Sequence, residues 1–185
     1  EPEILAAYKR GTESLKKVLF ELSKGQYALN EVKLLFVGEG GVGKTCLLKR
    51  LKGETPERDS TSTKGMEISL QSFSLPINDD EERGKCNGWD FGGQNHYQDT
   101  HHFFFTAPAI YLVVWEPRSG ADGSRVVHWI KKVIQRTFNV SKPEDKPHII
   151  VVATHRDDLN NCPAYINTDY LMEEFGGFIK SFHHI

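Results

Sequence analysis

The chain has 185 residues, which is the size of one ordinary domain. Hydrophobic residues make up 38% of it, a low share for a compact domain but sufficient for a single core. The formal net charge of −2 argues against nucleic acid or an anionic membrane surface as the partner. No apolar run approaches the roughly 20 residues that a helix needs to cross a bilayer, so we expect neither membrane insertion nor a signal peptide.

The cysteines Cys46, Cys86 and Cys162 are odd in number and have no CxxC spacing. Free thiols of this kind are typical of a reducing compartment, so we expect a cytoplasmic location. The chain opens on Glu1 and stops on Ile185 within an apolar stretch, which suggests a segment of a longer protein.

Hydrophobic periodicity predicts the elements in chain order. An amphipathic helix is expected over 12–24, so we assign 1–30 to a helical linker segment and 31–185 to the main domain. Strands are expected at 32–37, at 66–75, up to Trp89-Asp90, at 109–115 and at 148–154, and helices at 43–52, 124–138 and 168–175. The Pro-, Gly- and Ser-containing segments 117–123 and 140–147 are predicted to be loops. Strands that alternate with helices predict an α/β fold with a mostly parallel sheet and helices on both faces.

The segment GEGGVGKT (38–45) directly follows the first predicted strand and fits the phosphate-binding loop pattern. Its backbone N–H groups would surround phosphate oxygens at the positive end of the following helix. Lys44 would reach the β- and γ-phosphates, and the Thr45 hydroxyl would ligate Mg²⁺. The alternative is a glycine-rich turn with an exposed lysine. The residues expected to bind the nucleotide here are Gly38, Gly40, Gly41, Val42, Gly43, Lys44, Thr45 and Cys46.

A second motif, WDFGGQ (89–94), stands at the end of a predicted strand. Asp90 can hold Mg²⁺ through a water, and the backbone N–H of Gly93 can meet the γ-phosphate. Both motifs occur in the expected order, each after a predicted strand. In this the chain resembles Ras-like small GTPases, whose second motif reads Asp-x-x-Gly-Gln. The resemblance implies that Gln94 orients the attacking water.

The segment STKGMEI (62–68) resembles the first switch of the same proteins, the Rab branch especially. By that resemblance Thr63 completes the Mg²⁺ shell, so that Thr45, Thr63 and Asp90 form the metal site. The alternative is a polar loop in which the four adjoining hydroxyl residues 60–63 cap or face solvent.

The base motif is THRD (154–157), where Ras-like GTPases carry Asn-Lys-x-Asp. The Asp157 carboxylate can accept hydrogen bonds from guanine N1–H and the 2-amino group, whereas adenine would leave it unpaired. Thr154 replaces the asparagine and His155 the lysine, so the bracing of the phosphate loop and the cover of the base are altered. An imidazole could still stack on guanine. The alternative is that Asp157 and Asp158 only cap the next helix.

These variants resemble the Roc domain of Roco proteins, which include the leucine-rich-repeat kinases. That family favours Trp-Asp-Phe-Gly/Ala-Gly, Thr-His-x-Asp, and a His-x-Phe-Phe-x-Thr segment, here 101–106. The resemblance implies a Ras-like P-loop NTPase fold with a six-stranded sheet, and a Roc-type GTPase domain over 31–185 whose last guanine-binding motif lies beyond Ile185. It also implies GTP or GDP with Mg²⁺ as ligands, upstream leucine-rich repeats, a downstream COR domain and a homodimer.

Three functions remain open at this point. One is a slow Mg²⁺-dependent GTPase, and another is a nucleotide-gated dimerisation or interaction module with incidental turnover. A P-loop kinase or ATPase is disfavoured by Asp157. Arg118, Arg125 and Arg156 could supply an arginine finger or be ordinary solvated side chains. Phe103, Phe104 and Phe105 could be core residues or a partner surface.

Overall fold

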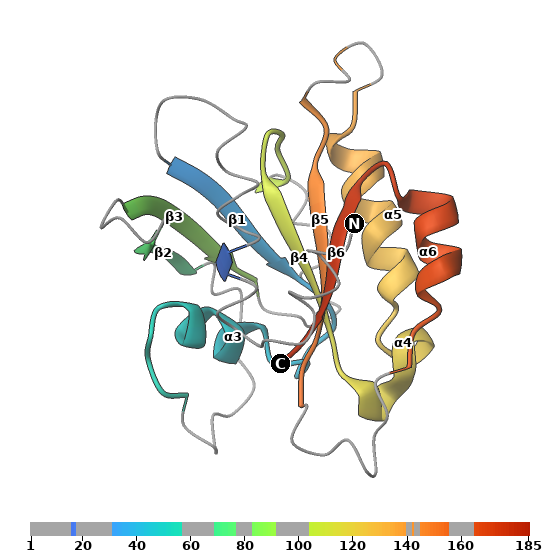
Figure 1. Cartoon of the computed structure of the whole chain (residues 1–185), viewed down its shortest axis with the longest axis horizontal. Coiled ribbons are helices and arrows are strands. Elements are labelled where there is room, and N and C mark those ends of the chain that lie inside the picture. The colour runs from blue at the N-terminus through green and yellow to red at the C-terminus, as the bar shows by residue number, and fades with distance from the viewer. Residues whose placement is uncertain are drawn as a thin grey trace.

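The computed structural model describes residues 16–17, 31–56, 69–76, 83–91, 104–139, 142, 145–155 and 165–185. Its centre is a six-stranded sheet in the order β2-β3-β1-β4-β5-β6 (Figure 1). The strands are β1 (Glu31–Val37), β2 (Ser69–Pro76), β3 (Arg83–Asp90), β4 (Ile110–Trp115), β5 (His148–Ala153) and β6 (Ile179–His184). The helical elements are α3 (Lys44–Leu51), the 3-10 turn η3 (Pro117–Ser119), α4 (Gly120–Gly123), α5 (Val126–Thr137) and α6 (Thr168–Phe175).

The sheet is mostly parallel, as predicted. β1 pairs in parallel with β3 and β4, β4 with β5, and β5 with β6, whereas β2 runs antiparallel to β3 at one edge. The central strands β4 and β5 are almost wholly buried along their length, because helices cover the sheet on both sides. The predicted α/β architecture, a six-stranded and mostly parallel sheet with helices on both faces, is therefore confirmed.

One face of the sheet is covered by α5 and α6, on the right in Figure 1. The buried residues of α5 are Val126, Trp129, Ile130 and Val133, whose spacing of three and four positions forms one apolar stripe. They pack with strand residues such as Tyr111 and Val151 into one core cluster. The predicted helix over 124–138 corresponds to α5, which begins two residues later.

The opposite face is covered by α3. Its Leu47, Leu48 and Leu51 pack against Phe36 and Leu112 of the sheet. A helix of eight residues is too short to be stable alone, so α3 depends on this packing. Burial of each leucine contributes roughly 1.5–3 kcal/mol. The helix is thereby held directly against the end of β1.

The prediction of a loop over 117–123 is wrong, because η3 and α4 occupy these residues. Pro117 suits the first position of a helical turn, and the backbone N–H of Ser124 donates to the Gly120 carbonyl at 3.0 Å. Single turns are too short to carry hydrophobic periodicity, so composition alone indicated a loop. The predicted helix over 12–24, apart from its two described residues, and the start of the predicted strand at 66–68 lie outside the described residues.

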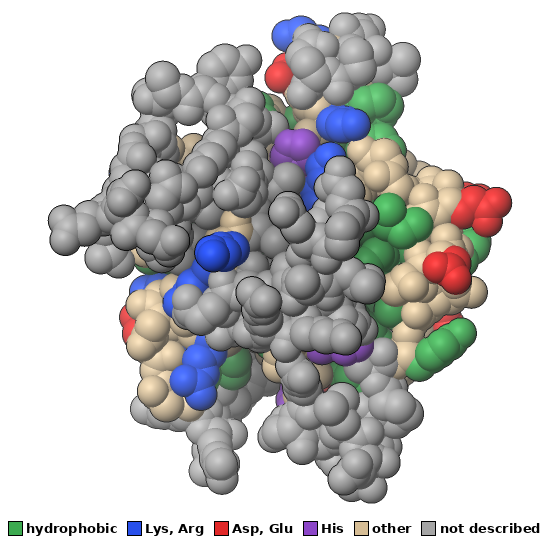
Figure 2. Space-filling view, viewed as in Figure 1, with side chains coloured by type: hydrophobic (Ala, Val, Ile, Leu, Met, Phe, Trp, Pro, Cys, Tyr) green, Lys and Arg blue, Asp and Glu red, His purple; other side chains and the backbone are tan. Residues whose placement is uncertain are grey.

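Charge is distributed unevenly over the described surface. Figure 2 shows acidic side chains over α6, on the right, and basic side chains over the region of α3. Asp169, Glu173 and Glu174 are the exposed acidic residues of α6, while Lys49 and Arg50 stand in the last turn of α3. Within the described part of the chain, no helix is both long and apolar enough to cross a bilayer.

Candidate nucleotide-binding site

The carboxyl ends of the parallel strands bring the sequence motifs to one edge of the sheet. β1 leads into the loop 38–43, β3 ends at Asp90, and β5 leads into Thr154 and His155. Because β1 lies between β3 and β4, and β4 lies next to β5, these strand ends are neighbours. Ligands of open α/β sheets bind at this edge.

Two glycines of the loop are required by its geometry. Gly38 has φ +147°, and a Cβ there would lie 2.2 Å from the backbone oxygen of Val114. Gly43 has φ +90°, and a Cβ there would lie 3.3 Å from Cγ2 of Thr154. The loop therefore runs close against β4 and the base motif. Gly43 is the N-cap residue of α3 and has no side chain that could cap the helix. The N–H groups of the first turn of α3 therefore receive no hydrogen bond from a capping side chain.

Lys44 is enclosed by this loop. Its Nζ donates to the carbonyl oxygens of Gly38 at 3.1 Å and Glu39 at 2.7 Å, and the residue is 6% exposed. Burial lowers the pKa of Lys44 to about 8, although the carboxylates of Asp90 and Glu39 act in the opposite direction. A phosphate anion would compensate the buried ammonium, so the position suits an anionic ligand.

Thr45 and Asp90 come together from α3 and β3. The Thr45 Oγ1 donates to Oδ2 of Asp90 at 2.5 Å, and Asp90 is buried. A hydroxyl and a carboxylate are oxygen donors that suit a hard cation such as Mg²⁺, so the pair fits the metal expected from the sequence. Among the described residues, no group of three or more His, Cys, Asp or Glu side chains is arranged so that it could hold a metal ion by itself.

Thr154 braces the phosphate loop. Its Oγ1 lies 2.9 Å from the carbonyl oxygen of Val42 and 3.3 Å from that of Trp115. The replacement of asparagine by Thr154 therefore does not remove the contact between the base motif and the loop. The Thr154 hydroxyl donates the hydrogen bond to the loop. Thr154 is buried, so this hydrogen bond is shielded from water.

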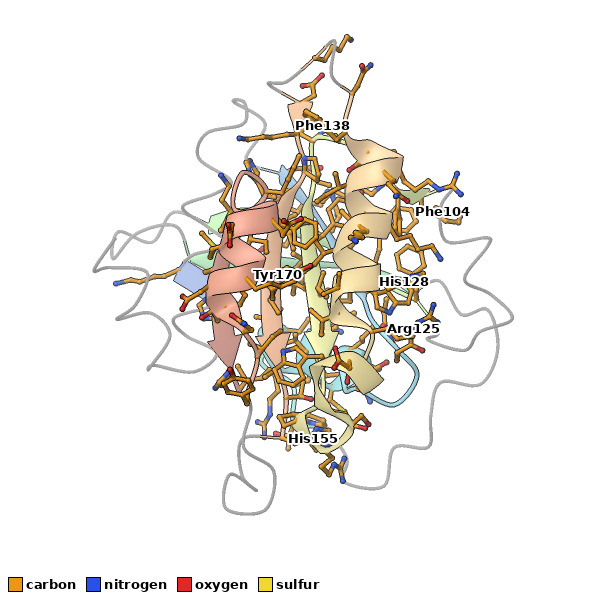
Figure 3. The ribbon with its side chains drawn as sticks, turned by 90° about the vertical axis from the view of Figure 1, so that its right-hand side faces the viewer. Phe104, Arg125, His128, Phe138, His155 and Tyr170 are labelled. Carbon is orange, nitrogen blue, oxygen red and sulfur yellow. The ribbon has the colours of Figure 1, made fainter. Side chains whose placement is uncertain are left out.

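His155 follows with both ring nitrogens in contact with protein groups. Its Nδ1 lies 2.9 Å from Thr154 Oγ1, and its Nε2 lies 3.0 Å from Nη2 of Arg118. The backbone of His155 has φ +62°, in the left-handed region that few non-glycine residues adopt. Figure 3 places His155 at the lower end of the sheet, opposite the end at which Phe138 lies.

Glu39 of the loop is tied to α5. Trp129 Nε1 donates to Glu39 Oε1 at 3.1 Å, and Nη1 of Arg125 lies 3.5 Å from the same oxygen. Of the arginines considered from the sequence, Arg125 therefore pairs with the phosphate loop, whereas Arg118 pairs with Glu116 and contacts His155. Arg156 lies outside the described residues.

The segment after the second motif packs as core. Phe105 is 6% exposed and belongs to the α5-side core, and the Phe104 ring lies 5.4 Å from that of Trp89. Lys33 contacts both residues of this ring pair. Its Nζ donates to the Phe104 carbonyl at 2.7 Å and lies 5.0 Å from the centre of the Trp89 ring. These two phenylalanines fit the core alternative, and Phe103 lies outside the described residues.

The structure thus brings together one part of the expected site. The loop residues lie with Thr45, Asp90, Thr154 and His155 at the same edge of the sheet. Cys46 follows in α3 and is partly exposed, and Gly40 and Gly41 are exposed in the loop. The expected residues that lie outside the described residues are Thr63, Gly93, Gln94 and Asp157.

Sequence patterns did not predict the contact of Glu39 with Trp129 or the contact of Arg118 with His155. The only local indication was Glu39 itself, an acidic residue in a loop predicted to bind phosphate. Such a residue needs a partner that holds its carboxylate away from the phosphates. The partner lies 90 positions away in the sequence, so no local pattern could have named it.

Comparison with known proteins identifies the family. The family model described as "Ras of Complex, Roc, domain of DAPkinase" matches residues 33–157. The chain is 34% identical to the probable serine/threonine-protein kinase pats1 of Dictyostelium discoideum, over 94% of this chain and 6% of pats1. It is 28% identical to the Ras-related protein RABE1d of Arabidopsis thaliana, over 60% of this chain and 50% of that protein.

Among solved structures, the chain is similar to the RocCOR part of Methanosarcina barkeri Roco2 bound to GDP. The TM-score is 0.66 at 31% identity, and the match covers 85% of this chain and 43% of the Roco2 chain. The chain thus spans only a small part of the pats1 protein and less than half of the Roco2 chain. On the family model and these relatives, the chain belongs to the Roc family of Ras-like GTPase domains.

Proposed function

We propose that this Roc domain binds guanine nucleotide with Mg²⁺, hydrolyses GTP slowly to GDP and phosphate, and acts as a nucleotide-dependent switch within a larger Roco protein. The observation that carries the proposal is the meeting of Thr45 with Asp90, 2.5 Å apart, beside the buried Lys44. A hydroxyl, a carboxylate and an ammonium at one strand end match the chemistry of a metal-bound phosphate chain.

In this proposal Lys44 and the backbone N–H groups of Gly38, Gly40, Gly41, Val42 and Gly43, with those of Thr45 and Cys46, hold the phosphates. Thr45, Thr63 and Asp90 hold Mg²⁺, which supplies charge neutralisation to the phosphate oxygens when bound. The low pKa of Lys44, about 8, supports an anionic ligand, because a phosphate would restore the ammonium form that burial disfavours.

We assign recognition of the guanine base to Asp157, and we assign Thr154 and His155 to the same base-binding motif. The hydrogen bond from Thr154 Oγ1 to the Val42 carbonyl supports this, since it joins the base motif directly to the phosphate loop. The GDP bound to the similar Roco2 protein supports the choice of guanine over adenine. Asp157→Asn is expected to shift the preference toward xanthine nucleotides, because an amide donates where the carboxylate accepts.

For hydrolysis we assign Gln94 to the orientation of the attacking water and the Gly93 N–H to the γ-phosphate. The test is single-turnover release of phosphate from GTP, with and without Mg²⁺, in the wild type and in Gln94→Leu. Loss of rate in Gln94→Leu with unchanged GTP affinity supports the assignment. An unchanged rate would contradict it, and preferential binding of ATP would contradict the proposed function as a whole.

A second candidate is a nucleotide-gated dimerisation or interaction module, with upstream leucine-rich repeats and a downstream COR domain in the full protein. The hydrogen bond from Trp129 to Glu39 favours it, because it links the phosphate loop to the long helix α5. Sedimentation of the chain with GDP and with a non-hydrolysable GTP analogue tests the homodimer. Equal self-association in the two states would remove the gating role.

A further inference from the structure

A chain of hydrogen bonds runs from Arg118 to the phosphate loop across the ends of three neighbouring strands. Arg118 Nη2 lies 3.0 Å from His155 Nε2, His155 Nδ1 lies 2.9 Å from Thr154 Oγ1, and Thr154 Oγ1 lies 2.9 Å from the Val42 carbonyl. Arg118 follows β4, His155 follows β5 and Val42 follows β1. Only the last of these contacts is expected from the role of the base motif.

The directions of these hydrogen bonds follow from chemistry. A guanidinium has donors and no acceptor, so His155 Nε2 must accept from Arg118 and carries no proton. In a neutral imidazole the proton is then on Nδ1, which donates to Thr154 Oγ1. The tautomer of His155 is therefore set by Arg118.

This choice of tautomer decides where the single proton of the Thr154 hydroxyl goes. With Nδ1 as a donor, the hydroxyl proton is left for a carbonyl, and the Val42 oxygen at 2.9 Å is closer than the Trp115 oxygen at 3.3 Å. In the other tautomer the Nδ1 lone pair would compete with the Val42 carbonyl for that proton.

The same contacts fix the plane of the His155 ring. Hydrogen bonds to both nitrogens lie in the ring plane and oppose rotation of the imidazole. His155 has φ +62°, and the two side-chain contacts help to hold this sparsely populated backbone conformation. Arg118 is itself held by Glu116, whose Oε2 lies 3.0 Å from Nη2.

We propose that Arg118 and His155 are positioning residues of the nucleotide site: Arg118 selects the Nδ1–H tautomer of His155, which directs the Thr154 hydroxyl to the phosphate loop and slows nucleotide release. The effect on release rests on the proposed guanine-nucleotide binding. The tautomer does not, so the two can be tested separately.

The first measurement is the protonation pattern of the His155 ring by ¹⁵N nuclear magnetic resonance at neutral pH, with the signal assigned from its loss in His155→Phe. The wild type is expected to show a protonated Nδ1 and an unprotonated Nε2, and Arg118→Leu is expected to shift the ring toward Nε2–H. A wild-type ring that is already protonated on Nε2 alone, or a ring unchanged in Arg118→Leu, overturns the proposal.

The second measurement is the dissociation rate of a fluorescent GDP in a double-mutant cycle. Because one exposed hydrogen bond is lost, Arg118→Leu is expected to speed release about three- to tenfold. Arg136→Leu is the matched control, since Arg136 is an exposed arginine in the last turn of α5, and it is expected to leave release unchanged.

In the His155→Phe background, Arg118→Leu is expected to have no further effect, because Arg118 acts through the imidazole. Equal effects of Arg118→Leu in both backgrounds would show that Arg118 acts independently and would overturn the proposal. Absence of GDP binding in the wild type would instead refute the proposed function. The tautomer measurement would still decide the role of Arg118 in that case.

Discussion

Trp129 Nε1 donates a 3.1 Å hydrogen bond to Oε1 of Glu39 and so joins the buried face of α5 to the second residue of the phosphate loop. Arg125, at the start of the same helix, lies 3.5 Å from that oxygen and is 43% exposed. An acidic side chain close to bound phosphates would repel them, and these two contacts keep the carboxylate on α5. A glutamate in this loop is therefore compatible with the phosphate binding that we propose for it.

Replacement of Glu39 tests this link. Glu39→Ala removes the acceptor and leaves the buried indole N–H of Trp129 unsatisfied, so we expect a loss of about 1–3 kcal/mol in the free energy of unfolding. Glu39→Gln keeps an acceptor oxygen and should lose clearly less. Urea denaturation measures both, and equal stability of the two variants would show that the hydrogen bond contributes nothing.

Gly38 and Gly41 form a matched pair within the loop. In Gly38→Ala the new Cβ would lie 2.2 Å from the Val114 oxygen, which is backbone of a central strand and cannot yield, so we expect a loss of more than about 3 kcal/mol. Gly41 has φ +80° with nothing within 4 Å of a Cβ, so Gly41→Ala should cost only about 1–2 kcal/mol. Thermal unfolding ranks the two, and the reverse order would contradict this account of the loop.

Nucleotide binding should weaken at alkaline pH because of Lys44. Burial lowers the pKa of Lys44 to about 8, whereas bound phosphates favour the ammonium form and raise it. Affinity for GDP is therefore highest below pH 8 and falls as the pH rises through that value, by at most about tenfold per pH unit. Titration calorimetry in two buffers of different ionisation heat should detect proton uptake at about pH 8.5. A flat affinity profile between about pH 7 and 9 would argue against a titrating Lys44.

The hydroxyl of Thr154 can be removed with little change of shape. Thr154→Val loses the donor to the Val42 carbonyl, so we expect about 1–2 kcal/mol lower stability and faster release of GDP. Thr154→Ser keeps the hydroxyl and should preserve most of both properties. If the valine and serine variants release GDP at the same rate, the brace has no part in holding the nucleotide.

His183 should make the domain sensitive to acid. The residue is 1% exposed, and burial, followed by the charge of His184, lowers the pKa of His183 to about 4. Between about pH 6.5 and 4 the unfolded chain binds a proton that the folded chain does not, so stability falls with falling pH by as much as about 3 kcal/mol.

His183→Gln is the variant that tests this acid sensitivity. It retains a polar group near Ser181, 2.9 Å from His183 Nε2 in the wild type, but it cannot titrate. Its free energy of unfolding should fall less steeply than that of the wild type over the same pH range. Parallel curves for the two proteins would assign the acid sensitivity to other groups.

Much of the fold could be predicted because it depends on local patterns. Continuous apolar runs locate β4 and β5, and the three- and four-residue spacing locates α5. The single turns η3 and α4 were predicted as loop, because four residues are too few to show a period. The phosphate-binding loop is a prediction of the same local kind, since phosphate binding requires glycines and a lysine at fixed offsets.

Sequence patterns are enough to predict most of the strands and helices, the motifs and the family, because each pattern depends on residues close together along the chain. Which of these residues come into contact depends on how the strands are arranged in the folded sheet. Glu39 reaches Trp129 across 90 positions, and Thr154 reaches Val42 across 112. Both contacts exist because the strand order β1-β4-β5 brings three separate carboxyl ends to one edge of the sheet, a non-local pairing that no local pattern encodes.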